Sequence, residues 1–340
     1  MEFGILEFMP SAPSYPQTTV GELGEAGILA LLQESYAGYT SGPGVIGPGD
    51  DAAVIPAPGG KFVIATDAMN EGHHFLRTWP SGITDNGYST GWKLVAQNLS
   101  DMNAMGAVSS AVNIALAMPK DTPAAWVARF GRGIVNACRW LGADQTIVSG
   151  GDLTRADTIA TAITATANLV GEPILRTADQ DVTDFLLIHI GNVGLSAAGL
   201  TVAAQGTAQS LTREEIVALR GFLRPRPPLA QGPKVVGVVA AMMDVSDSIL
   251  TDADRLAAAN ALHAHIDPAW TERKAAGLQP VAAKYDADPR EWVLTGGEDY
   301  GLLAVLDPRA PIPEGWEAIG RLTTEPQERP DVTGWDHFLA

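Results

Sequence analysis

Seven aspartates of this chain stand in turns or close to the ends of apolar runs, where a carboxylate can project from a buried element. They are Asp50, Asp51, Asp67, Asp101, Asp152, Asp244 and Asp247. Carboxylates that converge repel one another unless a cation neutralises them. All-oxygen ligands suit Mg²⁺, which keeps water ligands and bridges to substrate phosphates. The pattern therefore predicts a Mg²⁺-dependent enzyme that handles phosphate groups.

Two double-glycine segments end in acids and follow short apolar runs. They are Gly150-Gly-Asp152 and Thr295-Gly-Gly-Glu-Asp-Tyr300. Because glycine has no Cβ, backbone amides there can approach a phosphate closely, so we expect phosphate-binding turns. The run from Gly42 to Gly47 matches the dinucleotide fingerprint only formally, since no strand-like run precedes it. The sequence has no Walker A motif and no zinc-ligand spacing.

The composition excludes several classes of partner. The 340 residues are 46% hydrophobic and only 18% charged, with a net charge of −17. An acidic surface argues against binding to nucleic acid or to an anionic membrane, both of which attract basic patches. The single cysteine, Cys138, can form no intrachain disulfide, and we expect it in the core. Residues 1–18 carry acids and prolines rather than a basic leader, which predicts a disordered extension of a cytoplasmic protein.

Hydrophobic periodicity predicts a mixed α/β chain that must position these acids. In the first half, helices are expected at 20–36, 88–105 and 123–141, and strands at 62–66, 112–118, 146–149 and 159–170. In the second half, a strand is expected at 185–190, helices at 196–205, 213–223 and 249–262, and a buried run at 235–243. Residues 171–173 mark the expected domain boundary. Helices and strands alternate without strict βαβ order, so two α/β domains with mixed sheets are predicted.

The motifs, taken in order, resemble those of the thiamine-monophosphate kinase family, within the superfamily of aminoimidazole ribonucleotide synthetase-like ATP-binding enzymes. The resemblance covers roughly residues 20–338 and rests on segments spread over both halves. They are Gly49-Asp-Asp-Ala-Ala, Thr66-Asp67, Glu71-Gly-His-His-Phe75, Gly91-Trp-Lys-Leu-Val-Ala-Gln-Asn-Leu-Ser-Asp101, Gly150-Gly-Asp152, Arg176, Met243-Asp-Val-Ser-Asp247, Thr295-Gly-Gly-Glu-Asp-Tyr300 and Gly334-Trp-Asp-His-Phe338.

The resemblance implies a fold, an assembly and a reaction. The fold would comprise an N-terminal metal- and ATP-binding domain (residues 19–171) and a C-terminal domain (residues 172–340). The N-terminal domains of two chains would pair their sheets into a barrel, giving a homodimer. The reaction would be direct in-line phosphorylation of thiamine monophosphate to thiamine diphosphate, with ATP as co-substrate and several Mg²⁺ ions.

The resemblance also implies roles for individual residues. Metal ligands would be Asp51, Thr66, Asp67, Asp101, Asp152, Asp244 and Asp247. ATP would be bound by Gly151, Asp152, Arg176 and Ser246. Thiamine monophosphate would be bound by His74, Glu298 and Trp335. No general base is expected, because a phosphate nucleophile is already ionised at neutral pH.

The sequence also departs from the family pattern in the second half. Ser248 replaces the usual glycine after Ser-Asp, and the segment after Arg176 lacks the usual Arg-Ser-Gly-Ala-Lys-Pro-Gly-Asp sequence. Two alternatives therefore stay open. One is a sister enzyme of the superfamily that acts on another substrate, and the other is a catalytically weak nucleotide-binding homologue.

Overall fold

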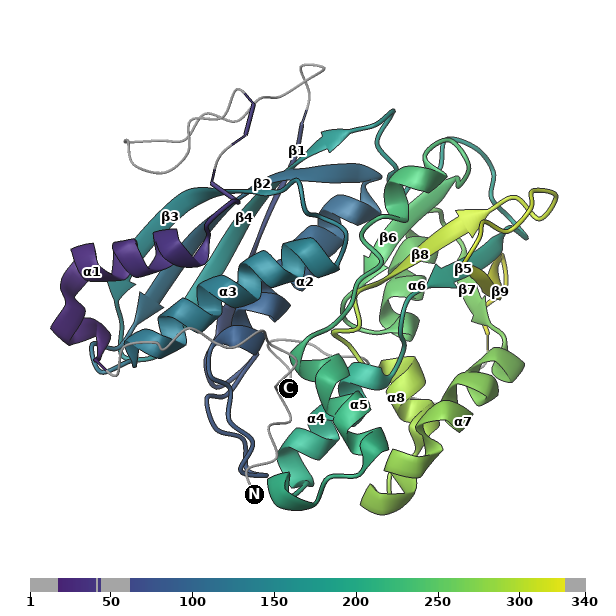
Figure 1. Cartoon of the computed structure of the whole chain (residues 1–340). Helices are drawn as coiled ribbons and strands as arrows, with labels where there is room; N and C mark the ends of the chain where they lie inside the picture. The colour runs from purple at the N-terminus through teal and green to yellow at the C-terminus, as the bar shows by residue number, and fades with distance from the viewer. Residues whose placement is uncertain (1–17, 41, 44–61, 328–340) are drawn as a thin grey trace.

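The chain forms two β-sheets, each packed against helices (Figure 1). The structure, a computed structural model, describes residues 18–40, 42–43 and 62–327. Two of the expected site residues, Asp51 and Trp335, and almost all of the expected N-terminal extension lie outside these ranges.

The first sheet has the strand order β1-β4-β2-β3. Its strands are β1 (Phe62–Asn70), β2 (Ala107–Met118), β3 (Ile147–Arg155) and β4 (Ala160–Leu169). The β2–β3 pair is parallel, whereas β4 pairs with β1 and β2 in antiparallel fashion. This sheet is mixed, as the sequence predicted.

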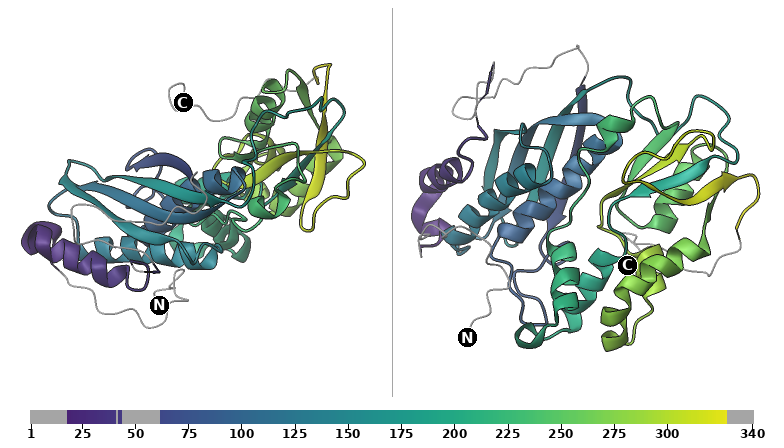
Figure 2. Two further views of the ribbon diagram at one scale, coloured as in Figure 1. Left: turned by 90° about the horizontal axis from the view of Figure 1, so that it is seen from above. Right: turned by 45° about the vertical axis from the view of Figure 1, so that its right-hand side comes forward.

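Three helices cover one face of the first sheet (Figure 2, left). They are α1 (Val20–Ser35), α2 (Tyr88–Ala104) and α3 (Ala124–Trp140). Glycines bring α2 and α3 together, because a Cβ on Gly91 would lie 2.1 Å from the carbonyl oxygen of Phe130. A Cβ on Gly133 would lie equally close to the carbonyl oxygen of Tyr88. The long, almost wholly buried α2 is thereby fixed under the sheet.

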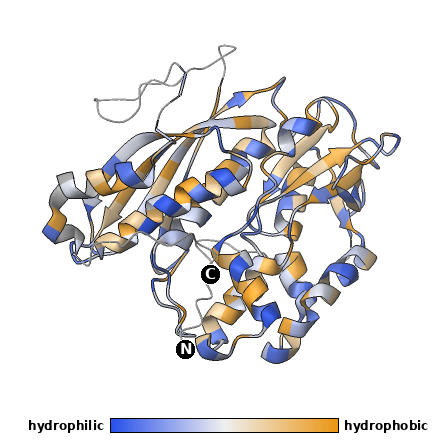
Figure 3. Ribbon diagram, viewed as in Figure 1, coloured by the Kyte–Doolittle hydropathy of each residue, from blue (hydrophilic) through white to orange (hydrophobic). Residues whose placement is uncertain are grey.

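The second sheet is antiparallel throughout, in the order β6-β8-β5-β9-β7. Its strands are β5 (Leu186–Ile190), β6 (Ala241–Val245), β7 (His263–Ile266), β8 (Gly301–Leu306) and β9 (Glu317–Thr323). Strands β5 and β8 are mostly hydrophobic (Figure 3) because both of their faces are covered.

Five α-helices and two short 3₁₀ turns complete the second half. They are α4 (Leu195–Gln205), α5 (Arg213–Leu223), α6 (Ile249–Ala258), α7 (Pro268–Tyr285), α8 (Pro289–Thr295), η1 (Ala208–Ser210) and η2 (Gly232–Val235). Asp267 and Asp288 are the N-cap residues of α7 and α8, and a proline follows each of them at the first helical position. Each carboxylate accepts a backbone N–H from the residue after that proline. None of the helices in the described ranges is long and apolar enough to cross a membrane.

Most expected elements are present, and three expectations are wrong. The second sheet is not mixed, because all of its neighbouring strands pair in antiparallel fashion. The run 235–243 is not one buried segment, since η2 ends at Val235, β6 begins at Ala241, and Val238 between them is 46% exposed. Gly150, Gly151 and Asp152 lie inside β3 rather than in a turn after it. These residues belong to the parallel ladder with β2, so their backbone groups on that side are used in strand pairing.

Candidate active site between the two sheets

A cavity of about 440 Å³ lies where the two halves of the chain meet. The first half contributes Asp67 of β1, His74 from the segment after β1, and Asp101 of α2. The second half contributes Asp244 of β6 and Glu298 from the segment between α8 and β8, with Ser246 and Asp247 just after β6. Seven of the expected site residues therefore line one cavity of a size usual for small-ligand sites.

Two hydrogen bonds join the acid-bearing strands β1 and β6 to helix α2. The Ser100 hydroxyl on α2 donates to Asp244 Oδ2 at 2.6 Å. The backbone N–H of Asp67 donates to Asn98 Oδ1 at 3.0 Å. Helix α2 thus connects an acid of each sheet and carries Asp101 itself.

The carboxylates at this junction disturb one another's protonation. Burial, together with the negative charges of Asp244 and Asp67, raises the pKa of Asp101 to about 9. Burial also raises the pKa of Asp244 to about 6, while the hydrogen bond from Ser100 acts in the opposite direction. Such shifts arise where several acids share too little compensating charge.

This donor set is chemically suited to a hard cation. Carboxylate oxygens from three separate elements approach one another, and their raised pKa values report a deficit of positive charge. Within the described residues, no group of three His, Cys, Asp or Glu side chains is already arranged to hold a metal ion. Asp247 forms an ion pair with Arg255.

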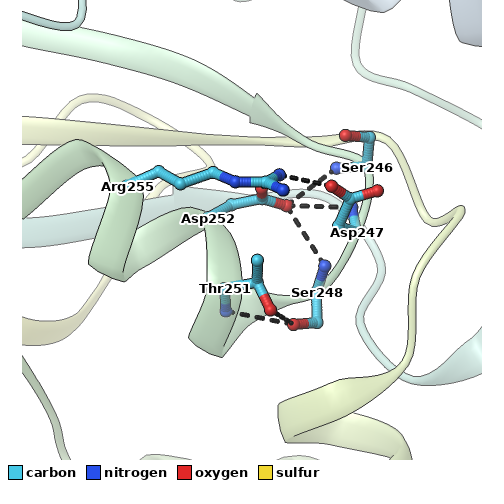
Figure 4. Close-up of polar contacts among 6 residues, drawn as sticks. All are labelled: Ser246, Asp247, Ser248, Thr251, Asp252 and Arg255. Carbon is cyan, nitrogen blue, oxygen red and sulfur yellow. Dashed lines mark hydrogen bonds and ion pairs between the residues drawn. The ribbon is translucent and has the colours of Figure 1, made fainter. Parts of the chain in front are cut away.

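The loop after β6 is built around one buried carboxylate, that of Asp252 (Figure 4). Asp252 Oδ2 accepts the backbone N–H groups of Ser246, Asp247 and Ser248 at 3.0, 3.0 and 3.1 Å. Its other oxygen pairs with Arg255 at 2.9 Å, and Arg255 also binds Asp247. Asp252 therefore fixes the backbone from which Ser246 and Asp247 reach the cavity.

Ser248 fits where the family pattern has glycine. Its backbone is extended, with φ 169°, so no residue with a left-handed conformation is required. Its hydroxyl accepts the N–H of Thr251 at 3.1 Å and starts α6. The departure from the pattern is thus accommodated locally.

The segment Gly296–Tyr300 is bonded to the same loop. The backbone N–H of Glu298 donates to the carbonyl oxygen of Ser246 at 2.7 Å. Glu298 and Tyr300 both have positive φ, at 64° and 54°, which is costly for residues other than glycine and is common at functional sites. The neighbouring Asp299 is buried, accepts the N–H of Ser196 at the start of α4, and has its pKa raised to about 7 by burial.

Lys93 ties the two halves together beside the cavity. Its ammonium donates to Glu298 Oε2 at 2.6 Å and to the carbonyl oxygen of His74 at 3.2 Å. The Lys93 side chain is only 3% exposed. An ion pair so deeply placed constrains Glu298 relative to α2.

Four expected site residues do not line the cavity: Thr66, Gly151, Asp152 and Arg176. The Thr66 hydroxyl bonds to Thr164 at 2.9 Å, on the face of the sheet away from the helices. Asp152 lies on β3, three strand spacings or about 14 Å from β1. A Cβ on Gly151 would lie 1.7 Å from the carbonyl oxygen of Ile114, so glycine there serves strand pairing.

Arg176 is close enough to act electrostatically although it does not line the cavity. Its positive charge lowers the pKa of both Asp101 and Asp244. Its backbone is held by Asn260, whose side-chain amide donates to the Arg176 carbonyl oxygen at 2.9 Å. The altered sequence after Arg176 is therefore anchored to the turn that follows α6.

The motif analysis did not single out Lys93, Ser100 or Asp252. The lysine could have been noticed as the one charge within the apolar stretch Trp92–Lys93–Leu94–Val95. Asp252 carried no comparable signal, because a helix position four residues after Ser248 is ordinarily solvated.

Comparisons with known proteins now bear on this arrangement. Residues 49–170 match the family model described as AIR synthase related protein, N-terminal domain. Thiamine-monophosphate kinase of Mycobacterium tuberculosis is 33% identical over 304 residues, which cover 86% of each chain. The chain belongs to the thiamine-monophosphate kinase family.

Solved structures agree with this membership. AaThiL complexed with AMPPCP and TMP has a TM-score of 0.74 and 26% identity, covering 94% of this chain and 99% of that one. Hydrogenase maturation protein HypE in complex with ATP has a TM-score of 0.62 at 14% identity, over 90% of this chain and 88% of the other, and shows only the shared fold. The expected two-sheet fold of the superfamily is thereby confirmed for this thiamine-monophosphate kinase family member.

Proposed function

We propose that the chain transfers the γ-phosphoryl group of ATP to thiamine monophosphate, forming thiamine diphosphate and ADP. One observation carries the proposal: acids from both sheets meet in a single cavity of a thiamine-monophosphate kinase family member. A structure of a relative holds the ATP analogue AMPPCP together with TMP, so both substrates have a counterpart in the family.

Metal binding at the acids is part of this proposal. Asp67, Asp101 and Asp244 would hold Mg²⁺, with Asp247 joining after release from Arg255. When bound, Mg²⁺ would neutralise charge on the phosphates and align them. Ser246, whose backbone N–H is held by the Asp252 carboxylate, would bind a phosphate oxygen. The phosphate of thiamine monophosphate needs no base, since it is ionised at neutral pH.

Three expected ligands do not line the cavity. Asp152 and Gly151 on β3, and Thr66 on the uncovered face of β1, are assigned to ATP and metal only through the family motif. Asp51 and Trp335, outside the described residues, keep their proposed metal and substrate roles on the same basis. A cytoplasmic location is also proposed on the basis of family membership.

A homodimer is also proposed, because none of the described helices covers the second face of the first sheet. Alternate residues of β4 on that face, Thr164 and Thr166 among them, are part-exposed while their neighbours are buried against the helices. Asn113 and Ala115 of β2 are exposed on the same sheet. Pairing two such faces would bury them. Light scattering that gives a monomer mass at micromolar concentration would contradict this assembly.

The decisive experiment measures ADP release from ATP and Mg²⁺ with and without thiamine monophosphate. We expect release that depends on thiamine monophosphate, with thiamine diphosphate as the product. A catalytically weak nucleotide-binding protein would release almost no ADP in either case. A sister enzyme would release ADP with another phosphate acceptor and not with thiamine monophosphate.

A further inference from the structure

Several arginines lie close together outside the cavity, in a chain whose net charge is −17. Arg224, directly after α5, places its guanidinium 5.9 Å from the centroid of the Tyr88 ring at the start of α2. Arg226 follows two residues later, and Arg220 lies one helical turn earlier on α5. None of these residues lines the cavity. Positive charge is thus concentrated beside Tyr88 in an acidic protein.

Helix α3 brings a further arginine towards the same tyrosine. The side-chain amide of Asn136 donates to the Tyr88 hydroxyl at 3.0 Å. Arg132 lies one turn before Asn136, on the same face of α3, and is half-buried. Tyr88 therefore contacts both Arg224 and the helix face that carries Arg132. We call Arg132, Arg224 and Arg226 the arginine group.

The segment that carries Arg224 and Arg226 is held against α2. The indole N–H of Trp92 donates to the carbonyl oxygen of Pro225 at 2.8 Å. Three of the residues 225–228 are prolines, whose rings fix one backbone angle and so limit the conformations of the segment. Charged side chains on such a segment are positioned before a ligand arrives, which lowers the entropy lost on binding.

The charges of these arginines act on one another and on Tyr88. Burial lowers the pKa of the Arg224 guanidinium, and the positive charges of Arg220 and Arg226 lower it too. Burial raises the pKa of the Tyr88 hydroxyl, whereas the charges of Arg224 and Arg132 lower it. Charges in solution act mainly within about 10 Å at 0.1 M salt. These mutual effects therefore agree with the contacts in placing the guanidinium groups on one small area.

Acidic side chains leave the positive charge of the arginine group largely uncompensated. In the part of the chain that the structure describes, neither Arg132 nor Arg224 nor Arg226 forms an ion pair. Asp85 is an acid whose charge acts on Arg224, but it is buried and its carboxylate accepts the N–H and the hydroxyl of Thr90. A bound anion would supply the missing negative charge.

We propose that the arginine group is a second ligand site, outside the cavity, for a small molecule that carries two or more linked phosphate groups. Guanidinium groups bind phosphate oxygens in a bidentate manner, and several of them can bind successive phosphates of one chain. The net charge of −17 disfavours a long polyanion such as nucleic acid, whereas a compact ligand interacts mainly with charges within about 10 Å. The site does not depend on the phosphoryl transfer proposed above.

The test is calorimetry on the full chain in EDTA at low salt, with inorganic tripolyphosphate as the probe. Without Mg²⁺ the acids of the cavity repel a polyanion, so binding there is disfavoured. AMPPCP is titrated in the same way, to distinguish a nucleotide from a free polyphosphate. Arg132→Gln and Arg226→Gln each remove one charge, and Arg226→Lys keeps it. The matched control is Arg273→Gln, which removes an exposed arginine from α7.

We expect the unaltered protein to bind tripolyphosphate and to bind inorganic monophosphate much more weakly. Arg132→Gln and Arg226→Gln should each raise the Kd for tripolyphosphate about fivefold, because each removes a charge-assisted contact. Arg226→Lys should raise it less, and Arg273→Gln should leave it unchanged. An AMPPCP affinity that falls in the same two variants would show that the site accepts a nucleotide, and absent AMPPCP binding would restrict it to free polyphosphate.

Three results would overturn the proposal. The first is no binding of tripolyphosphate by the unaltered protein. The second is the same Kd in the unaltered protein, Arg132→Gln and Arg226→Gln. The third is an equal loss of affinity in Arg273→Gln, which would mean that only the net charge of the protein matters. Each of these results would leave the release of ADP in the presence of thiamine monophosphate untouched, so the proposed function is tested separately.

Discussion

Replacing Asp101 with asparagine should stabilise the metal-free protein, even though the variant should lose activity. The pKa of Asp101 is raised from 3.8 to about 9, first by burial and then by the charges of Asp244 and Asp67. In the folded state the carboxyl group therefore keeps a proton that the unfolded chain has released at neutral pH. Because the folded pKa is the higher one, this residue costs stability increasingly as pH rises from about 4 to about 9.

The size of the effect follows from the shift. Between pH 3.8 and pH 7 the cost is at most about 4 kcal/mol, at 1.36 kcal/mol per pH unit. Since Asp67 and Asp244 share the repulsion, we expect Asp101→Asn to raise the free energy of unfolding by about 2 kcal/mol at pH 7. The gain should grow towards pH 9 and vanish near pH 4.

The assay is urea unfolding in EDTA at several pH values and constant ionic strength, repeated with Mg²⁺. The unaltered protein should gain stability from Mg²⁺, because only the folded state assembles the acids, whereas Asp101→Asn should gain much less. The control is Asp144→Asn, which removes an exposed carboxylate from the same half of the chain. A variant that was less stable than the unaltered protein at pH 8 in EDTA would refute the repulsion argument.

Three further predictions concern His189, a buried residue of β5 in the second sheet, and two residues beside the site, Asp252 and Lys93. His189 is fully buried and its pKa is lowered to about 4, so the free energy of unfolding should fall by up to about 3 kcal/mol as pH drops from 6.5 to 4. In denaturant titrations His189→Leu should reduce this pH dependence, and an unchanged dependence of the unfolding free energy on pH would contradict the prediction. Asp252→Asn should weaken AMPPCP binding about tenfold by loosening the loop after β6, whereas the control Asp254→Asn, on the exposed side of α6, should not weaken it. Equal AMPPCP affinities of the two variants in calorimetry would contradict the role of Asp252 in holding this loop. Lys93→Met should lower the free energy of unfolding by about 1–3 kcal/mol, because Glu298 loses its ion-pair partner. Adding Glu298→Gln should recover part of this loss, and a double variant no more stable than Lys93→Met would exclude the ion pair as the cause.

Local patterns in the sequence predicted most of the elements and several of the acids that line the cavity. The apolar stripe of α2 specified a helix at 88–105, within one residue of the observed end, because periodicity of 3.6 residues is a local property. The acids were recognisable one by one, since a carboxylate near the end of an apolar run is unusual whatever surrounds it. The segment Gly296–Tyr300 joins α8 to β8, after the apolar run that the sequence showed.

What the sequence alone did not determine is which acids meet. Asp67 and Asp152 both stand close to the end of an apolar run, yet the order β1-β4-β2-β3 places them on opposite edges of one sheet. Strand order depends on packing between distant segments, which no local window contains. The pair of Lys93 and Glu298 spans 205 positions of the chain, and the bond from Ser100 to Asp244 spans 144. Residue types thus fixed the available chemistry, whereas long-range packing decided which groups share a cavity and how far their pKa values move.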